Sequence, residues 1–172
     1  MRTRRLPSAN RSPRRDAADI SLLVIHTISL PPGRFGTGLV ADLFLNRLDV
    51  SADPSLADLE GVRVSAHVFI DRRGRAIQFV PFDQAAWHAG ESAWRGREGC
   101  NAFAVGIELE GEEHRSCTKA QYRRLHAVLD ALLARYPRLS RTGIVGHLEI
   151  APGRKTDPGP AFDWAGVLGR LW

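Results

Sequence analysis

The sequence SLLVIH (residues 21–26) is a run of mostly apolar residues that ends in His26. Such a run is typical of a strand buried on both faces of a sheet. The segment FAVGIELEG (103–111) alternates along most of its length, which is typical of a strand with one apolar face, and Glu108 lies on the opposite face. These two segments predict sheet strands, one ending in an imidazole and the other carrying a carboxylate.

The remaining elements predict how this sheet is completed. The segment VSAHVFIDRRGRAIQFVPF (64–82) has the pattern of a β-hairpin, with strands around Ala66–Ile70 and Ala76–Val80. Helices are predicted after an N-cap at Thr37, from Thr118 to Tyr136 and over 161–172, and a last strand over 143–147. Strands with interspersed helices and one hairpin predict a mixed central β-sheet flanked by helices, of the α/β (α+β) class, in a single domain.

Length and composition indicate one globular domain. The chain has 172 residues, of which 44% are hydrophobic and 25% charged. No apolar run approaches the roughly 18 residues that cross a bilayer, so no membrane partner is expected.

The positive charge is concentrated at the N-terminus. Six arginines and two aspartates fall within residues 1–20, which therefore hold four of the five net positive charges. We expect residues 1–20 to form a basic, partly ordered arm before a nearly neutral domain over 21–172. The arm could bind polyanions, but the neutral body argues against a nucleic-acid partner.

The first twenty residues also lack the apolar segment of a secretory signal, which favours a cytoplasmic protein. The two cysteines, Cys100 and Cys117, have no CxxC spacing and are expected to be free thiols.

The loop GHLEIAPGRKTDPGP (146–160) places reactive side chains among glycines and prolines. A solvated turn would explain its charges, but His147 follows an apolar strand, and Lys155 and Asp157 can fold back towards it. His26 ends another strand, so the two imidazoles can converge. With Asp157 they form a set of three ligands and one open position, the pattern of a catalytic Zn²⁺ site.

Two more residues are candidates for a role at this site. Glu108 could serve as general base and acid beside a metal, or be a solvated strand residue. His88 lies in a long connection over 81–102 that is expected to be functional or poorly ordered, and it could line a substrate site or be structural. His67 is expected to be a packed sheet histidine.

Several segments together resemble the Amidase_2 family of zinc amidases. They are VIHTISLPPGRFGTG, RVSAHVFI, QFVPFDQAAWHAGES, GREGCNAFAVGIELEG and GHLEIAPGRKTDPGPAFDW. The resemblance implies the fold shared with peptidoglycan-recognition proteins, and one zinc ion held by His26, His147 and Asp157. It further implies cytoplasmic hydrolysis of the amide between the lactyl group of (1,6-anhydro)-N-acetylmuramic acid and L-alanine during peptidoglycan recycling.

The resemblance also implies roles for single residues. Glu108 would be the catalytic acid and base, Lys155 would lie beside the metal, and Arg63 and Trp87 would contact the anhydro-muropeptide substrate. The chain is expected to act as a monomer. Two rival functions stay open: a lytic amidase that cuts intact peptidoglycan, and a non-catalytic peptidoglycan-recognition module.

Two positions depart from the family pattern. The residue after His26 is commonly asparagine, whereas here Thr27 offers a shorter hydroxyl that could still bind substrate. An arginine often precedes the CN pair, whereas here Gly99 does. Neither departure affects the expected metal ligands.

Overall fold

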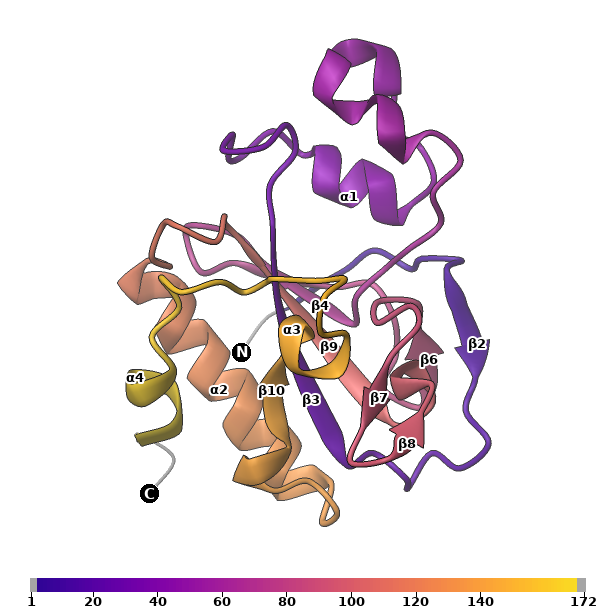
Figure 1. The fold of residues 1–172 in the computed structure, drawn as a ribbon, viewed down its shortest axis with the longest axis vertical. Helices are drawn as coiled ribbons and strands as arrows, with labels where there is room; N and C mark the ends of the chain where they lie inside the picture. The colour runs from indigo at the N-terminus through magenta and orange to yellow at the C-terminus, as the bar shows by residue number, and fades with distance from the viewer. Residues whose placement is uncertain (1–2, 170–172) are drawn as a thin grey trace.

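Within residues 3–169, six strands form the central sheet in the order β1-β5-β4-β9-β3-β10, of which Figure 1 labels β4, β9, β3 and β10. Their bounds are Arg4–Arg5 (β1), Ala76–Gln78 (β5), Val68–Ile70 (β4), Ala104–Glu110 (β9), Leu22–Ile28 (β3) and Ile144–Gly146 (β10). Strand β5 is antiparallel to β4, and every other neighbouring pair is parallel. This computed structural model describes residues 3–169, and its mixed sheet confirms the predicted fold class.

In the described part of the chain, four α-helices and two small sheets lie around this sheet. The helices are α1 (Leu39–Phe44), α2 (Lys119–Arg135), α3 (His147–Ile150) and α4 (Trp164–Gly169). Antiparallel pairs join β2 (Arg11–Pro13) to β6 (Gln84–Ala86) and β7 (Ala93–Trp94) to β8 (Arg97–Glu98). Short 3₁₀ turns cover Val50–Ala52, Pro54–Leu59, Cys100–Ala102 and Arg141–Gly143. No helix within residues 3–169 is long and apolar enough to span a membrane.

Helix α2 covers one face of the sheet and lies beside α4 in Figure 1. It begins with the predicted capping box. The Thr118 hydroxyl accepts from the backbone N–H of Gln121 at 3.1 Å, and the side-chain oxygen of Gln121 accepts from the backbone N–H of Thr118 at 3.0 Å. Its apolar stripe, including the fully buried Leu125 and Leu129, packs on the inward residues of β3 and β9. The largest apolar cluster therefore lies between α2 and the sheet.

Two smaller apolar clusters lie on the opposite face. One is built around α1 and includes Phe44, Phe69 and Phe79, while the other joins Val24 to Phe103. Because side chains alternate along a strand, the residues of β3 and β9 that do not face α2 point to this side. The candidate site residues of both strands are among them.

Two short strands form within the N-terminal residues that the structure describes. Strand β1 pairs with β5, and β2 pairs with β6. The guanidinium of Arg14 donates to the carbonyl oxygens of Phe82, Asn101, Ala102 and Ala104 at 2.6–3.0 Å. Residues 3–20 are therefore packed against the domain, because their backbone and Arg14 bond to partners that are distant in sequence.

Several elements differ from expectation. The N-cap residue of α1 is Gly38 in a left-handed conformation (φ 85°), and the hydroxyl of Thr37, one residue earlier, accepts from the Leu39 N–H at 3.3 Å and donates to the Leu30 carbonyl. Neither histidine ends a strand, because β3 continues past His26 to Ile28 and His147 begins α3. The connection over 81–102 contains β6, β7, β8 and a 3₁₀ turn. The C-terminal helix is present as α4, and residues 170–172 of its predicted span lie outside the described part of the chain.

Candidate metal and catalytic site

Strands β3 and β9 carry two site residues side by side. His26 and Glu108 are partners in the parallel register of these strands. Their neighbours Ile25 and Ile107 are fully buried in the cluster under α2, so His26 and Glu108 project from the other face of the sheet. The imidazole and the carboxylate thus start from adjacent positions on rigid strands.

The loop after β10 brings the other two expected ligands to His26. The backbone N–H of Leu148 donates to the Asp157 carbonyl at 3.1 Å, which folds the loop back onto α3. His26 Nδ1 lies 3.0 Å from His147 Nδ1 and 3.1 Å from Asp157 Oδ2, and His147 Nδ1 lies 3.1 Å from Asp157 Oδ1. The three side chains expected from the sequence therefore converge on one point.

The donor chemistry of this cluster fits a cation. His147 Nε2 lies 3.1 Å from the Ala89 carbonyl, which can only accept, so this nitrogen carries the proton and Nδ1 of the neutral ring presents a lone pair. That lone pair faces a second imidazole nitrogen and a carboxylate. Two imidazole nitrogens and a carboxylate, with atoms 3.0–3.1 Å apart, are a donor set of the kind that binds Zn²⁺.

Electrostatics favour the metal-binding protonation states of two ligands. Burial alone would raise the pKa of Asp157, but hydrogen bonds and charge from His147 and His26 outweigh it, so the pKa lies below its usual value. Burial lowers the pKa of His26 despite the opposing effect of Asp157. An ionised carboxylate and a neutral imidazole are the forms that coordinate a metal.

Glu108 sits in an environment that disfavours its charge. Its Oε2 atom is buried and has no hydrogen-bond partner among the described residues. Burial, and then the nearby charge of Asp157, raise the pKa of Glu108 well above its usual value, while Lys155 opposes them. A carboxylate whose pKa is raised in this way can both accept and return a proton near neutral pH.

A cavity of about 260 Å³ opens over these residues. Eight of the nine expected site residues line it: His26, Thr27, Trp87, His88, Glu108, His147, Lys155 and Asp157. Lys155 is exposed, and its charge acts on both Glu108 and His26. The cavity thus combines a candidate metal cluster, a half-buried carboxyl group and an ammonium group.

Comparison with known proteins agrees with this geometry. The model of the Amidase_2 family, described as N-acetylmuramoyl-L-alanine amidase, matches residues 16–160. The chain belongs to this family. It is 52% identical over 162 residues to the 1,6-anhydro-N-acetylmuramyl-L-alanine amidase AmpD of Citrobacter freundii, covering 94% of this chain and 86% of the relative. The AmpD of Escherichia coli K12 is 51% identical over 162 residues, with 94% and 88% covered.

Solved structures show the same fold. A crystal structure of a selenomethionine AmpD derivative superposes with a TM-score of 0.93 at 50% identity, covering 97% of this chain and 93% of that one. The Escherichia coli amidase AmiD superposes with a TM-score of 0.67 at 30% identity, covering 94% of this chain and 61% of its own.

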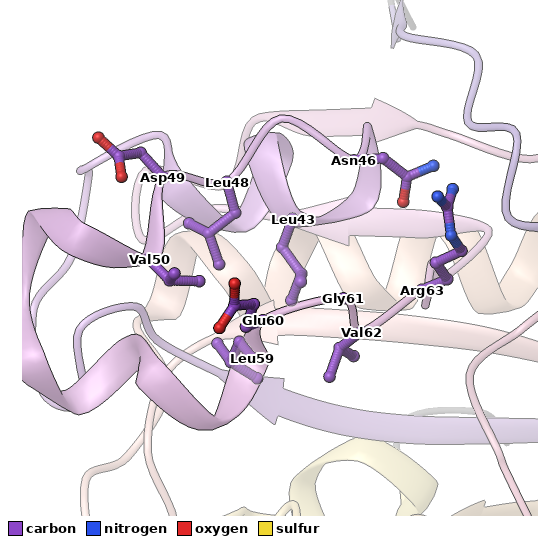
Figure 2. A pocket seen from close by; sticks show the side chains of 10 residues that line it. All are labelled: Leu43, Asn46, Leu48, Asp49, Val50, Leu59, Glu60, Gly61, Val62 and Arg63. Atoms are coloured by element: carbon purple, nitrogen blue, oxygen red, sulfur yellow. The ribbon is translucent and has the colours of Figure 1, made fainter.

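Arg63 of this amidase lies apart from the metal cavity. It is exposed and lines a neighbouring pocket between α1 and the segment after Leu59. Figure 2 shows Arg63 and Asn46 at one end of this pocket and Asp49 at the other. The two pockets share three wall residues, Leu43, Leu59 and Val62.

Some supporting residues were missed from the sequence. Asn101 Oδ1 accepts from the backbone N–H groups of His88 and Ala89 at 3.1 and 2.9 Å. Arg154 Nη2 donates to the Ala89 carbonyl at 2.6 Å, the same oxygen that His147 contacts. Both residues lie inside the motifs that resemble the family, but their partners are distant in sequence. Only the folded structure shows that Asn101 and Arg154 fix the backbone at His88 and Ala89.

Glu149 also has a defined position in the amidase. Its Oε2 accepts from the Gly146 backbone N–H at 2.7 Å, directly before the ligand His147. This bond stabilises the start of α3. Glu149 therefore stabilises α3, the helix that begins with the candidate metal ligand His147.

Proposed function

We propose that this chain hydrolyses the amide between the lactyl group of 1,6-anhydro-N-acetylmuramic acid and L-alanine, in peptidoglycan recycling. The observation that carries the proposal is the convergence of His26, His147 and Asp157 beside half-buried Glu108, whose Oε2 is buried and unpaired among the described residues. The relatives that are about half identical over nearly the whole chain are named as enzymes of this specificity. A related AmiD structure is described as a complex with an anhydro-N-acetylmuramic acid tripeptide.

In this proposal His26 Nδ1, His147 Nδ1 and an Asp157 oxygen hold Zn²⁺. When bound, the ion supplies Lewis acidity that polarises a carbonyl and lowers the pKa of water towards about 7. Glu108 takes a proton from the attacking water while the water oxygen bonds to the amide carbon. Lys155 stabilises the negative charge that develops on the carbonyl oxygen.

Glu108 then returns the proton to the alanine nitrogen as the carbon–nitrogen bond breaks. The products are a lactyl carboxylate and a peptide with a free amino group. Trp87 offers an apolar surface to the sugar or peptide, Thr27 and His88 stand in the cavity wall beside it, and Arg63 is suited to bind a substrate carboxylate.

The proposed mechanism needs no residue from a second copy of the chain, and we propose that the enzyme acts as a monomer. The two cysteines within the described chain are buried and unpaired, which suits the reducing cytoplasm. Light scattering on the purified protein tests the monomer, and a dimer that shares the cavity would contradict it.

The deciding experiment compares two substrates with and without a chelator. We expect soluble 1,6-anhydro-muramyl tripeptide to release free tripeptide, identified by mass spectrometry, and the release to stop when the metal is removed. Addition of Zn²⁺ should restore it. Faster cleavage of insoluble peptidoglycan would instead favour a lytic amidase, and no cleavage of either by the zinc-loaded protein would favour a recognition module.

A further inference from the structure

His88 contacts the ring edge of His26 that faces away from the ligand cluster. His88 Nδ1 lies 3.0 Å from His26 Nε2, and the two rings meet edge to face at 81° with their centroids 5.1 Å apart. The other nitrogen of His26, Nδ1, faces His147 and Asp157. His88 therefore stands behind the metal ligand.

The direction of this hydrogen bond follows from the ligand geometry. A neutral imidazole that offers the lone pair of Nδ1 to a metal carries its proton on Nε2. His26 Nε2–H must then donate, and His88 Nδ1 must accept. This arrangement leaves the proton of His88 on Nε2, a buried nitrogen with no hydrogen-bond partner within residues 3–169.

The His88 ring is held in place by the strand beneath it. A Cβ atom added to Gly106 of β9 would lie 2.4 Å from His88 Cγ, so the ring occupies the space that any other residue at position 106 would fill. Asn101 fixes the backbone N–H of His88, and the ring of His67 lies edge-on to that of His88, with centroids 5.7 Å apart. The ring has little freedom to turn away from His26.

The next residue supports the second ligand histidine. His147 Nε2 donates to the Ala89 carbonyl, as described above. Two consecutive residues of one loop, His88 and Ala89, thus provide the acceptors for both imidazole ligands. Acceptors of this kind set the tautomer and orientation of metal-binding histidines, and their loss typically lowers metal affinity about 10- to 100-fold.

We propose that His88 is a positioning residue for the metal site, which holds His26 in the tautomer and orientation that coordinate Zn²⁺, and that Gly106 is required to seat its ring. This inference rests on the proposed metal ligands and assigns His88 a role other than contact with substrate.

The main test measures the zinc affinity of matched variants by competition with a chromophoric chelator. His88→Phe keeps a ring over Gly106 but removes the acceptor, and we expect about 10- to 100-fold weaker binding. His88→Gln retains an acceptor and should lie between Phe and the wild type. His126→Phe is the matched control, because His126 is also buried and contacts a carbonyl, that of Gly166, but belongs to α2. It should leave zinc affinity unchanged.

A second test addresses Gly106. Gly106→Ala should weaken zinc binding and lower thermal stability while His88 is present. In the double variant Gly106→Ala/His88→Ala the added methyl group has room. Its zinc affinity and thermal stability should therefore be close to those of His88→Ala alone. Equal costs of Gly106→Ala with and without His88 would overturn the packing part of the proposal.

NMR spectra of the wild-type protein test the proposal even where the variants fold poorly. In ¹⁵N-histidine NMR spectra of the wild-type zinc protein, we expect the proton of His88 on Nε2 and that of His26 on Nε2. A proton on His88 Nδ1 would overturn the proposal, and so would wild-type zinc affinity in folded His88→Phe with only KM raised. Because zinc affinity is measured without substrate, a failure of the proposed hydrolysis would be seen separately, in the wild-type enzyme.

Discussion

At the scale of single residues, the proposed site assigns separate tasks to a few side chains. His26, His147 and Asp157 converge on one point, whereas Glu108 lies half-buried beside them with one buried oxygen that has no partner among the described residues. The proposal therefore predicts that metal binding and proton transfer can be separated by substitution.

Asp157→Ala should lose metal and activity together. Removing one of three ligands also leaves two imidazole lone pairs facing each other, so we expect zinc affinity to fall by more than the roughly 100-fold that loss of a supporting partner costs. Metal analysis after gel filtration, alongside the hydrolysis assay, checks this. Asp130→Ala, an exposed substitution on α2, is the control. Stoichiometric zinc in Asp157→Ala would show that Asp157 is not a ligand.

Glu108→Gln should keep its zinc while hydrolysis falls about 10²- to 10⁴-fold, because the amide has the shape of the carboxyl group but cannot shuttle a proton. Single-turnover rates with the anhydro-muramyl tripeptide measure the loss. Glu91→Gln, which changes an exposed residue of the same region, should be close to wild type. Near-normal turnover by zinc-loaded Glu108→Gln would remove Glu108 from the mechanism.

At the scale of elements, the N-terminal segment and the 84–103 region depend on each other. Strand β2 pairs with β6, and the Trp87 indole N–H donates to the Ser12 hydroxyl at 2.7 Å. Arg14 bonds to four carbonyl oxygens between Phe82 and Ala104. The segment over 3–20, expected from the sequence to be a basic, partly ordered arm, therefore contacts Trp87, which lines the cavity.

Arg14→Ala should accordingly destabilise the fold by about 2–4 kcal/mol, because hydrogen bonds to a charged group are lost and several carbonyl oxygens lose their donor. The adjacent Arg15→Ala is the control, and as an exposed substitution it should stay within about 0.5 kcal/mol of the wild type. Urea unfolding of both variants provides the measurement. Equal, small effects would mean that the N-terminal segment contributes no measurable stability.

At the scale of the whole molecule, buried histidines couple stability to pH. His67 is fully buried, accepts from the Gly106 N–H through Nδ1 at 3.0 Å and donates to the Gln84 carbonyl through Nε2 at 2.9 Å. Burial, aided by the charge of Arg14, lowers the pKa of His67 to about 3. The expected packed sheet histidine is therefore present, and it is neutral at neutral pH.

This lowered pKa predicts the sign of a pH effect. Below about pH 6.5 His67 is protonated in the unfolded chain, whereas in the folded chain it stays neutral down to about pH 3. The contribution of His67 to the free energy of unfolding therefore decreases as the pH falls. The slope for one proton is about 1.4 kcal/mol per pH unit. In metal-free protein, the stability difference between the wild type and His67→Gln should narrow by this amount from pH 6 to pH 5. A constant difference in urea unfolding would refute the coupling.

The sequence alone determined most strands of the central sheet, the helices α1, α2 and α4, and the residue types at the site, but not β1, β2, β6, β7, β8 or α3. Apolar alternation in β9, the capping box of α2 and the turn residues of the 146–160 loop are local patterns, and local patterns set local structure. The expectation that His26, His147 and Asp157 lie together also came from the sequence, and the structure brings these three side chains together. Its premise that both histidines end strands is wrong, because β3 continues to Ile28 and His147 begins α3.

Only the tertiary structure decided which residues support that site. The placement of His88 behind His26, of Gly106 under its ring and of Arg14 among four carbonyls depends on contacts between segments far apart in the chain. The order of the N-terminal residues has the same origin. Such contacts form only when the whole sheet is assembled, because packing and burial are properties of the assembled fold and leave no period or spacing in the sequence.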